Sequence, residues 1–238
     1  MIIAVINQKG GVAKSTSTVN IGVALAQNEA RVLLLDLDTQ RDLLSYTDLT
    51  PSITLAPADQ SSLSGLLQGE YDHTLLDCSP ALNEESAAAL KVAHLALVPL
   101  QAEYAALRGL SRLMETIEVA RARNNPNLRL RILLTMFDAR ARHCAEVEAE
   151  VRKRFGAEVL APVIRRSITF AEASLAHQSI LQFAPRSAGA KAYRAVAQEL
   201  VEAFPSVLPL KPSQDKPGPS QASQSKPRRT KTTQEKAP

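Results

Sequence analysis

Residues 2–18 read IIAVINQKGGVAKSTST, and this stretch decides the fold. Its apolar start, residues 2–6, predicts a short buried strand that runs directly into a loop with two adjacent glycines, Gly10 and Gly11. Beyond the loop, apolar residues recur at helical spacing over residues 15–27. A strand, a glycine-rich loop and a helix in this order are typical of a loop that cradles phosphate on backbone N–H groups at a helix N-terminus.

The loop departs from the standard phosphate-loop pattern, G-x-x-x-x-G-K-[ST]. Gln8 and Ala13 occupy its two glycine positions, and Ala13 is compatible with the loop if its backbone keeps a helical angle. Lys14 should reach the β- and γ-phosphates, and the Ser15 hydroxyl should ligate Mg²⁺. A glycine-rich turn with surface lysines is the alternative. The predicted nucleotide-binding residues of the loop are Lys9, Gly10, Gly11, Val12, Ala13, Lys14, Ser15 and Thr16.

The rest of the chain alternates apolar strands with amphipathic helices. Further strands are predicted at residues 31–38, 71–77, 94–100 and 129–135, with a short one at 157–162. Further helices are predicted at residues 84–91, 109–123, 141–155 and 187–204, whereas the segment between the second strand and Tyr71 has no clear pattern. Alternation of this kind indicates an α/β fold, a parallel sheet flanked by helices on both faces.

Three acids follow predicted strands. Asp36 and Asp38 end the second strand and should point the same way because one residue separates them, and Asp77 ends the strand at 71–77. The carboxyl ends of parallel strands form the ligand-binding edge of such a sheet, so these acids should converge on the glycine loop. Carboxylates there can hold the Mg²⁺ shell or orient an attacking water. Alternatively, each acid only caps the element that follows it.

Composition is ordinary for a globular protein, with 45% apolar and 22% charged residues among 238. The two cysteines, Cys78 and Cys144, match no metal or disulfide spacing and favour a reducing cytoplasm. The N-terminus lacks the pattern of a signal peptide, and no apolar segment approaches the roughly 20 residues of a membrane span. We therefore expect a soluble cytoplasmic protein.

The net charge of +4 is unevenly distributed. Residues 205–238 hold seven basic and two acidic residues, a net charge of +5, so residues 1–204 carry −1. This terminal stretch also holds seven of the fourteen prolines and no large apolar residue after Leu210. Such a composition predicts a disordered basic tail at 205–238 behind one folded domain at 1–204.

Several segments together resemble a known family. KGGVAKST (9–16), LLLDLDTQ (33–40), YDHTLLDCSP (71–80), LVPLQAEYAALRGL (97–110) and LLTMFDAR (133–140) are similar to motifs of the deviant Walker A ATPases of the ParA/MinD group, ParA-type partition ATPases in particular. The resemblance covers about residues 1–204. It implies a P-loop NTPase fold with ATP and Mg²⁺ as ligands.

The resemblance also implies roles for individual residues. Lys9 reaches the nucleotide of the other subunit in an ATP-dependent homodimer, which explains the second lysine of the loop. Asp38 prepares the hydrolytic water, Asp36 supports the magnesium shell or the loop, and Thr135 lies near the adenine base. The catalytic residues implied are Lys9, Lys14 and Asp38, and the metal site is Ser15, Asp36 and the Walker B acid Asp77.

Four positions depart from the family pattern. Thr39 and Ser79 stand where the family usually has proline, and Arg41 stands where it has glycine. Arg165 replaces the proline of the VIPRN-like segment, which is VIRRS at 163–167. These differences bear on hydrolysis, base contacts and partner identity rather than on nucleotide binding.

ParA-type proteins bind DNA without sequence preference when dimeric with ATP, and a ParB-type partner stimulates hydrolysis. The resemblance therefore implies a nucleoid-associated switch for chromosome or plasmid partitioning. The chain starts at its first strand, as in the short class without an N-terminal helix-turn-helix. The basic residues that could contact DNA, each alternatively a solvated surface charge, are Arg165, Arg166, Arg186, Lys191 and Arg194.

Other functions remain open within the same fold. The same switch could position a cargo other than DNA on the nucleoid, such as chemoreceptor clusters or carboxysomes. A MinD-like protein would need a terminal amphipathic helix for membrane attachment, which the proline-rich tail does not provide. Nitrogenase iron-protein chemistry would need paired cysteines at the dimer axis. A metabolic ligase would need a further substrate pocket, which the sequence does not indicate.

Overall fold

The computed structural model describes residues 1–27, 29–81 and 83–204. Six strands form one parallel sheet in the order β3-β2-β4-β1-β5-β6. The predicted tail at 205–238 lies outside the described residues, so its order and its boundary stay predictions. The strands are β1 (Ile2–Val5), β2 (Val32–Asp36), β3 (Ile53–Pro57), β4 (His73–Asp77), β5 (Leu95–Gln101) and β6 (Arg129–Thr135).

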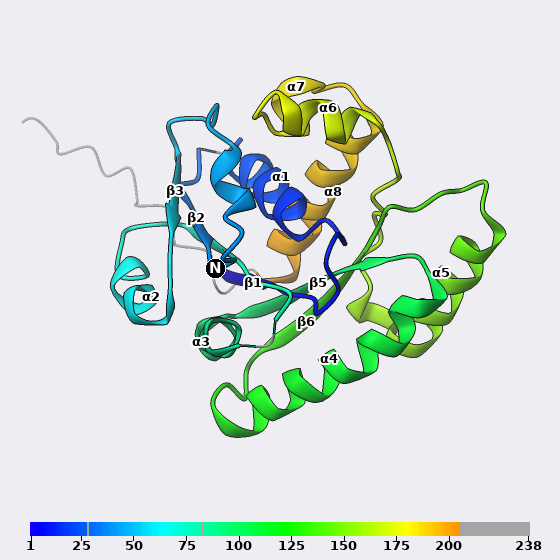
Figure 1. Cartoon of the computed structure of the whole chain (residues 1–238), viewed down its shortest axis with the longest axis horizontal. Helices are drawn as coiled ribbons and strands as arrows, with labels where there is room; N and C mark the ends of the chain where they lie inside the picture. The colour runs from blue at the N-terminus through cyan, green and yellow to red at the C-terminus, as the bar shows by residue number, and fades with distance from the viewer. Residues whose placement is uncertain (28, 82, 205–238) are drawn as a thin grey trace, which may run out of the picture. The chain divides into compact units, whose positions relative to one another are not determined.

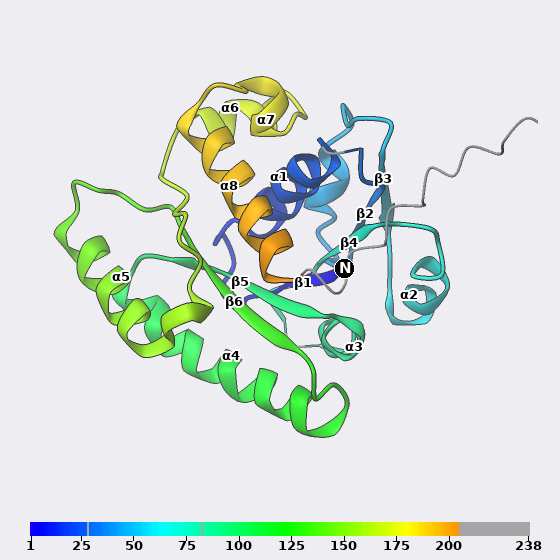
Figure 2. The same cartoon turned by 180° about the vertical axis from the view of Figure 1, so that it is seen from behind.

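Helices cover both faces of the sheet (Figure 1). One face carries α1 (Lys14–Ala26), α6 (Thr169–Leu175), α7 (Ile180–Phe183) and α8 (Ala188–Ala203), and Figure 2 shows α1 and α8 lying side by side. The other face carries α2 (Gln60–Leu66), α3 (Glu84–Val92), α4 (Tyr104–Arg123) and α5 (Arg142–Phe155). The predicted α/β fold with helices on both faces is confirmed.

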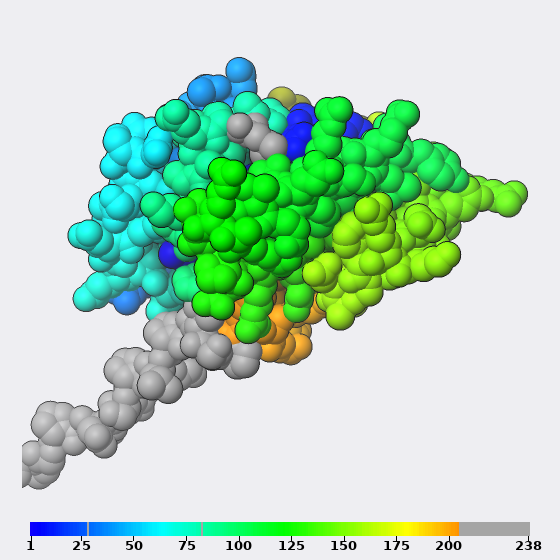
Figure 3. All heavy atoms as spheres, turned by 90° about the horizontal axis from the view of Figure 1, so that it is seen from below, coloured from blue at the N-terminus to red at the C-terminus, as the bar shows by residue number. Residues whose placement is uncertain are grey.

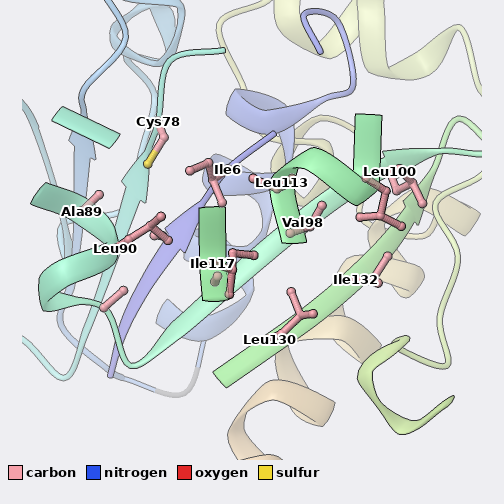
Figure 4. Packing of buried hydrophobic residues seen from close by; sticks show 14 of the residues in the cluster. Ile6, Cys78, Ala89, Leu90, Val98, Leu100, Leu113, Ile117, Leu130 and Ile132 are labelled. Atoms are coloured by element: carbon pink, nitrogen blue, oxygen red, sulfur yellow. The ribbon is translucent and has the colours of Figure 1, made fainter. Parts of the chain in front are cut away.

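The core is divided by the sheet into two apolar clusters. In β1, Ile3 and Val5 pack on the α1 side, whereas Ala4 packs on the opposite side, as the two-residue period of a strand requires. Figure 4 shows Leu113 and Ile117 of α4 turned toward the strands on this second side. Seen from below, the side chains of α4 and α5 cover that face (Figure 3). Burial on both faces explains why the strands are almost continuously apolar.

Helix α1, which begins at the glycine loop, is anchored by polar and steric contacts. The Ser17 and Tyr193 hydroxyls lie 3.1 Å apart in the interior, and the Asn20 side chain accepts a hydrogen bond from the Ile180 backbone N–H at 2.8 Å. Gly22 lets the helix approach β2, because a Cβ atom there would lie 2.7 Å from Leu34 Cδ2. These contacts hold the loop end of α1 at a defined place above the sheet.

Three local predictions differ from the structure. The segment without clear pattern contains β3 and α2, together with the 3-10 helix η1 (Asp42–Ser45). Helix α4 begins at Tyr104, five residues before the predicted start, because Gly109 is accommodated inside the helix. The predicted strand at 157–162 is wrong: the 3-10 helix η2 (Gly156–Glu158) and a single bridge between Ile132 and Val159 stand there. No helix in the described part of the chain is both long and apolar enough to cross a membrane.

Candidate nucleotide-binding site

A cavity of about 520 Å³ lies at the carboxyl ends of the strands. The loop between β1 and α1 forms one wall, and segments that follow β2, β4 and β6 form the others. This is the edge where parallel α/β sheets bind their ligands. The lining residues are Gly10, Gly11, Ala13, Lys14, Ser15, Thr16, Asp38, Gln40, Asp42, Ser45, Tyr46, Pro80, Met136 and Ser174.

The loop backbone turns through two left-handed residues, Gly11 at φ 71° and Ala13 at φ 68°. The condition stated for Ala13, a helical backbone angle, is met only in the left-handed helical region, where Ala13 is the N-cap that starts α1. This N-cap makes no side-chain hydrogen bond, and the first turn of α1 contains no acidic residue. The N-terminal N–H groups of α1 are therefore left without a capping side chain, which suits an anion such as phosphate.

Lys14 is buried at 7% exposure and lines the cavity. Burial lowers the pKa of its ammonium, and the charges of Asp77 and Asp38 oppose this lowering. The Lys14 ammonium is thus shielded from water and feels the negative charge of two carboxylates. A polyphosphate entering the cavity would supply further negative charge to the same ammonium.

Asp36 and Asp77 stand next to each other on the paired strands β2 and β4. Each has one buried carboxylate oxygen, Oδ2, that makes no hydrogen bond within the described residues. Burial raises the pKa of Asp77 to about 7, although the Ser15 hydroxyl and Lys14 act against the rise. Burial also raises the pKa of Asp36, opposed by the backbone N–H of Asp38 and by Arg41.

These oxygens fit a divalent cation. Hard cations such as Mg²⁺ prefer oxygen ligands, and the two unpartnered carboxylate oxygens with the nearby Ser15 hydroxyl supply them. Within the described residues no group of three or more acidic, histidine or cysteine side chains is arranged to hold a metal. A magnesium ion here would therefore complete its octahedron with water and phosphate oxygens, as it usually does in nucleotide sites.

Of the three predicted acids, Asp38 is the one that lines the cavity. Its carboxylate Oδ1 accepts a hydrogen bond from the Gln40 backbone N–H at 3.1 Å, and its own N–H donates to Asp36 Oδ1 at 3.0 Å. Asp36 is fully buried and does not line the cavity. The expectation that both side chains point the same way therefore fails, because β2 ends at Asp36 and the chain turns there.

Lys9 lies outside this cavity. Its ammonium donates to Oε1 of Gln101, the last residue of β5, and to Oε2 of Glu103, the residue before α4, both at 2.9 Å. The Lys9 side chain is 40% exposed and borders a separate cavity of about 210 Å³. Asn7 fixes the start of the loop, since its Oδ1 accepts from the Lys9 N–H at 3.0 Å and its Nδ2 donates to Pro99 O at 2.7 Å.

Thr135 supports the loop from beneath. The residue is fully buried, and its hydroxyl donates to the Val12 carbonyl at 3.2 Å. The next residue, Met136, has a left-handed backbone (φ 51°) and lines the cavity. The adenine contact inferred for Thr135 stays a prediction.

Sequence reasoning missed several residues of the site. Asp42, Ser45 and Tyr46 line the cavity from the segment that had no clear pattern, and Gln40 ends the motif LLLDLDTQ but was given no role. The signal for the first three was their position after a strand that ends in acids. Pro80 and Met136 lie in the motifs YDHTLLDCSP and LLTMFDAR that carry the family resemblance, but they were not among the predicted nucleotide-binding residues, and Ser174 lies in no motif.

The five basic residues proposed to contact DNA come from two segments. Arg165 and Arg166 precede α6 and are exposed, with Arg165 bridged to Phe137. Arg186 and Lys191 are exposed at the start of α8, whereas Arg194 is half-buried and donates to Gln27 Oε1 and Pro185 O. Their contact with DNA stays a prediction.

Comparisons with known proteins agree with this geometry. The family model described as CobQ/CobB/MinD/ParA nucleotide binding domain matches residues 3–180. The chromosome-partitioning ATPase Soj of Thermus thermophilus is 37% identical over 235 residues, which cover 84% of this chain and 94% of Soj. The chromosome partitioning protein ParA of Caulobacter vibrioides is 33% identical over 250 residues, covering 84% and 93%.

A solved structure points to the same family. Cobyrinic acid a,c-diamide synthase from Mycobacterium smegmatis, with bound ADP and magnesium, superposes with a TM-score of 0.71 at 30% identity and covers 86% of this chain and 95% of that one. The family match spans the glycine loop and the three acids Asp36, Asp38 and Asp77. The chain therefore belongs to the CobQ/CobB/MinD/ParA family of P-loop nucleotide-binding ATPases, with the partition proteins Soj and ParA among its homologues.

Proposed function

We propose that this protein is an ATP-dependent switch for partitioning chromosomes or plasmids. With ATP and Mg²⁺ it dimerises and binds DNA without sequence preference, and it hydrolyses ATP slowly until a ParB-type partner stimulates it. The observation that carries this proposal is the placement of two lysines. Lys14 lines the nucleotide cavity, whereas Lys9, five residues earlier, is held outside it at half exposure.

Binding of the triphosphate uses the loop and its lysine. The backbone N–H groups after Gly10 and the uncapped N-terminus of α1 take phosphate oxygens, and Lys14 offsets their charge. Ser15, Asp77 and Asp36 would hold Mg²⁺, directly or through water. Bound there, the ion would supply positive charge that offsets the negative charge of the phosphates during phosphoryl transfer.

Hydrolysis requires a positioned water. Asp38 faces the cavity and accepts a hydrogen bond from the water, which orients the water oxygen toward the γ-phosphorus. A bond forms between the water oxygen and the γ-phosphorus as the bond from that phosphorus to the β-phosphate oxygen breaks, which gives ADP and inorganic phosphate. The proton that the water loses passes to the phosphate product. Because the proposal gives Asp38 no contact with the nucleotide or with Mg²⁺, Asp38→Ala should still bind ATP and remain dimeric.

Dimerisation assigns a role to the outer lysine. If two protomers meet at their cavity faces, Lys9 leaves Gln101 and Glu103 and contacts the phosphates held by the other protomer. Each charge-assisted hydrogen bond contributes roughly 1.5–3 kcal/mol. Because each protomer makes this contact, the stability of the dimer depends on the γ-phosphate. Hydrolysis removes the γ-phosphate, and the protomers then separate.

DNA binding with ATP, with ADP and without nucleotide, measured across a range of salt, tests the proposal. We expect tight binding with ATP only, and a steep fall of affinity with salt because phosphate contacts dominate. Lys9→Ala should bind nucleotide yet neither dimerise nor bind DNA. Equal binding in all three nucleotide states would contradict the proposal and favour a metabolic role such as that of the related diamide synthase.

A further inference from the structure

Arg41 adopts a backbone conformation that few side chains tolerate. Its φ of 57° and ψ of 30° are left-handed, a region that favours glycine. The residue ends the turn that carries Asp38 and immediately precedes the 3-10 helix η1. A non-glycine residue stays in this region only where neighbouring contacts hold it there.

The guanidinium supplies such contacts. Its Nη1 donates to the Asp36 carbonyl, and it also donates to the Ala58 carbonyl at 3.3 Å. Asp36 is the last residue of β2, and Ala58 directly follows β3, so the guanidinium lies where these paired strands end. The Ala58 N–H donates to the same Asp36 carbonyl at 2.9 Å. The side chain thus ties the turn back to the rigid edge of the sheet.

The same turn directs Asp38. The Arg41 N–H donates to the Asp38 carbonyl at 3.1 Å, and the Gln40 N–H donates to Asp38 Oδ1 at 3.1 Å. If Arg41 relaxed to a right-handed conformation, the turn would open and the first of these bonds would break. The guanidinium and the Asp38 carboxylate are therefore connected through three residues of backbone.

We propose that Arg41 is a positioning residue for Asp38: by holding the Asp36 and Ala58 carbonyls, its side chain fixes the turn of residues 38–41 and the direction of the Asp38 carboxylate. Arg41 is not among the residues that line the cavity, so it acts through Asp38 and not on the nucleotide. The predicted effect of Arg41 on the rate of ATP hydrolysis rests on the proposed function. Its predicted effect on the rigidity of residues 38–41 does not.

Three substitutions at position 41 separate the effect of the guanidinium contacts from the effect of the left-handed backbone conformation. Arg41→Ala removes the guanidinium and keeps the steric cost of the left-handed conformation, whereas Arg41→Gly removes both the guanidinium and that cost. We expect kcat to fall about tenfold in each, since small misplacements of a catalytic group are costly, while the dissociation constant for ATP changes less than twofold. Arg41→Lys, which keeps one donor, should retain more of kcat than either.

Backbone order parameters from NMR provide a readout that does not need hydrolysis. In the wild type without nucleotide, the backbone amides of Gln40 and Arg41 should be rigid, with order parameters S² of about 0.85. In Arg41→Gly the order parameters at these two positions should fall below about 0.6. Arg140→Gly is the matched control, because the exposed Arg140 lies in a similar turn where its N–H donates to Asp138 Oδ1 at 2.9 Å. It should change neither kcat nor the order of residues 38–41.

The outcomes are distinct. Unchanged kcat and order parameters in Arg41→Gly and Arg41→Ala would overturn the inference, as would a loss of nucleotide affinity as large as the loss of kcat. A wild-type protein that hydrolyses no ATP would overturn the proposed function instead. In that case the order parameters alone would decide the role of Arg41.

Discussion

At the residue scale, the site combines conformations and charges that are unfavourable in the free protein. Ala13 is left-handed, and Asp77 is a buried acid with an oxygen that has no hydrogen-bond partner among the described residues. Both features make sense for a site completed by a ligand. A bound polyphosphate and cation would engage the backbone beside Ala13 and the free oxygen of Asp77. Functional sites commonly hold strain of this kind.

Ala13→Gly should stabilise the protein without nucleotide. Glycine adopts φ 68° without the steric cost that alanine carries, so the free energy of unfolding should rise by about 0.5–1 kcal/mol. Denaturant unfolding measures the change. Ala122→Gly, in the exposed part of α4, should lower the same quantity by about 1 kcal/mol. A loss of stability in Ala13→Gly would show that the left-handed conformation is not strained.

Asp77→Asn should stabilise the protein at high pH and not at low pH. Because burial raises the pKa of Asp77 from its ordinary 3.8 to about 7, the folded protein binds this proton more tightly than the unfolded chain. Stability is therefore lost as pH rises from about 4 to about 7, and the cost is fully present above about 7.

The amide in Asp77→Asn carries no charge at any pH and avoids that cost. Thermal unfolding without Mg²⁺ and nucleotide should show a higher Tm than the wild type at pH 8, equivalent to roughly 2–4 kcal/mol. The two proteins should be nearly equal at pH 4. A difference of the same size at both pH values would show that ionisation of Asp77 is not its source.

At the scale of single elements, helix α1 links the loop to the rest of the fold. It packs on the sheet through Gly22 and on α8 through the Ser17–Tyr193 contact. All strands except β3, together with the helices α1, α3, α4, α5 and α8, were predictable, because their apolar runs and helical spacings are strong. Elements β3, α2, α6 and α7 were not predicted: β3 is a half-exposed edge strand, α2 has one buried residue, Leu63, and α6 and α7 have only 7 and 4 residues. Short elements with so little burial leave a weak pattern.

Two glycine-to-alanine substitutions should act in opposite directions. At Gly22 of α1 the new methyl group would meet the fully buried Leu34 side chain at 2.7 Å, so the free energy of unfolding should fall by about 1–3 kcal/mol. At Gly65 of α2 no atom lies within 4 Å of the new methyl group, and stability should rise by up to about 1 kcal/mol. Urea unfolding compares both with the wild type. A neutral Gly22→Ala would mean that α1 can move away from β2.

At the scale of the whole molecule, the nucleotide cavity and the Lys9 contact lie at the same edge of the sheet. In the single chain the Lys9 ammonium is paired with Glu103, with side-chain exposures of 40% and 42%. Under the proposed function this pair must open before the dimer forms. Opening the Lys9–Glu103 ion pair costs free energy, and this cost weakens the dimer.

Glu103→Ala should therefore strengthen the ATP-dependent dimer. Half-exposed ion pairs contribute about 0–1 kcal/mol each, and two of them open per dimer, so the dimerisation constant should rise about fivefold. Sedimentation with a non-hydrolysable ATP analogue measures it. Glu118→Ala, which removes the exposed partner of Arg121 on α4, should have no effect. A weaker dimer in Glu103→Ala would indicate that Glu103 contributes to the interface directly.

Three features follow from the amino-acid sequence alone: the order of strand, glycine loop and helix, the parallel sheet with helices on both faces, and the gathering of Lys14, Asp38 and Asp77 at one edge. These follow from periodicity and from the rule that parallel strands end together. Four features became visible only in the folded chain: the left-handed Ala13, the contact of Lys9 with Glu103, the place of Thr135 beneath the loop and the anchoring of Arg41. The last three depend on contacts between residues that the fold brings together, and the conformation of Ala13 depends on the path of the loop into α1, so no local pattern of residues encodes them.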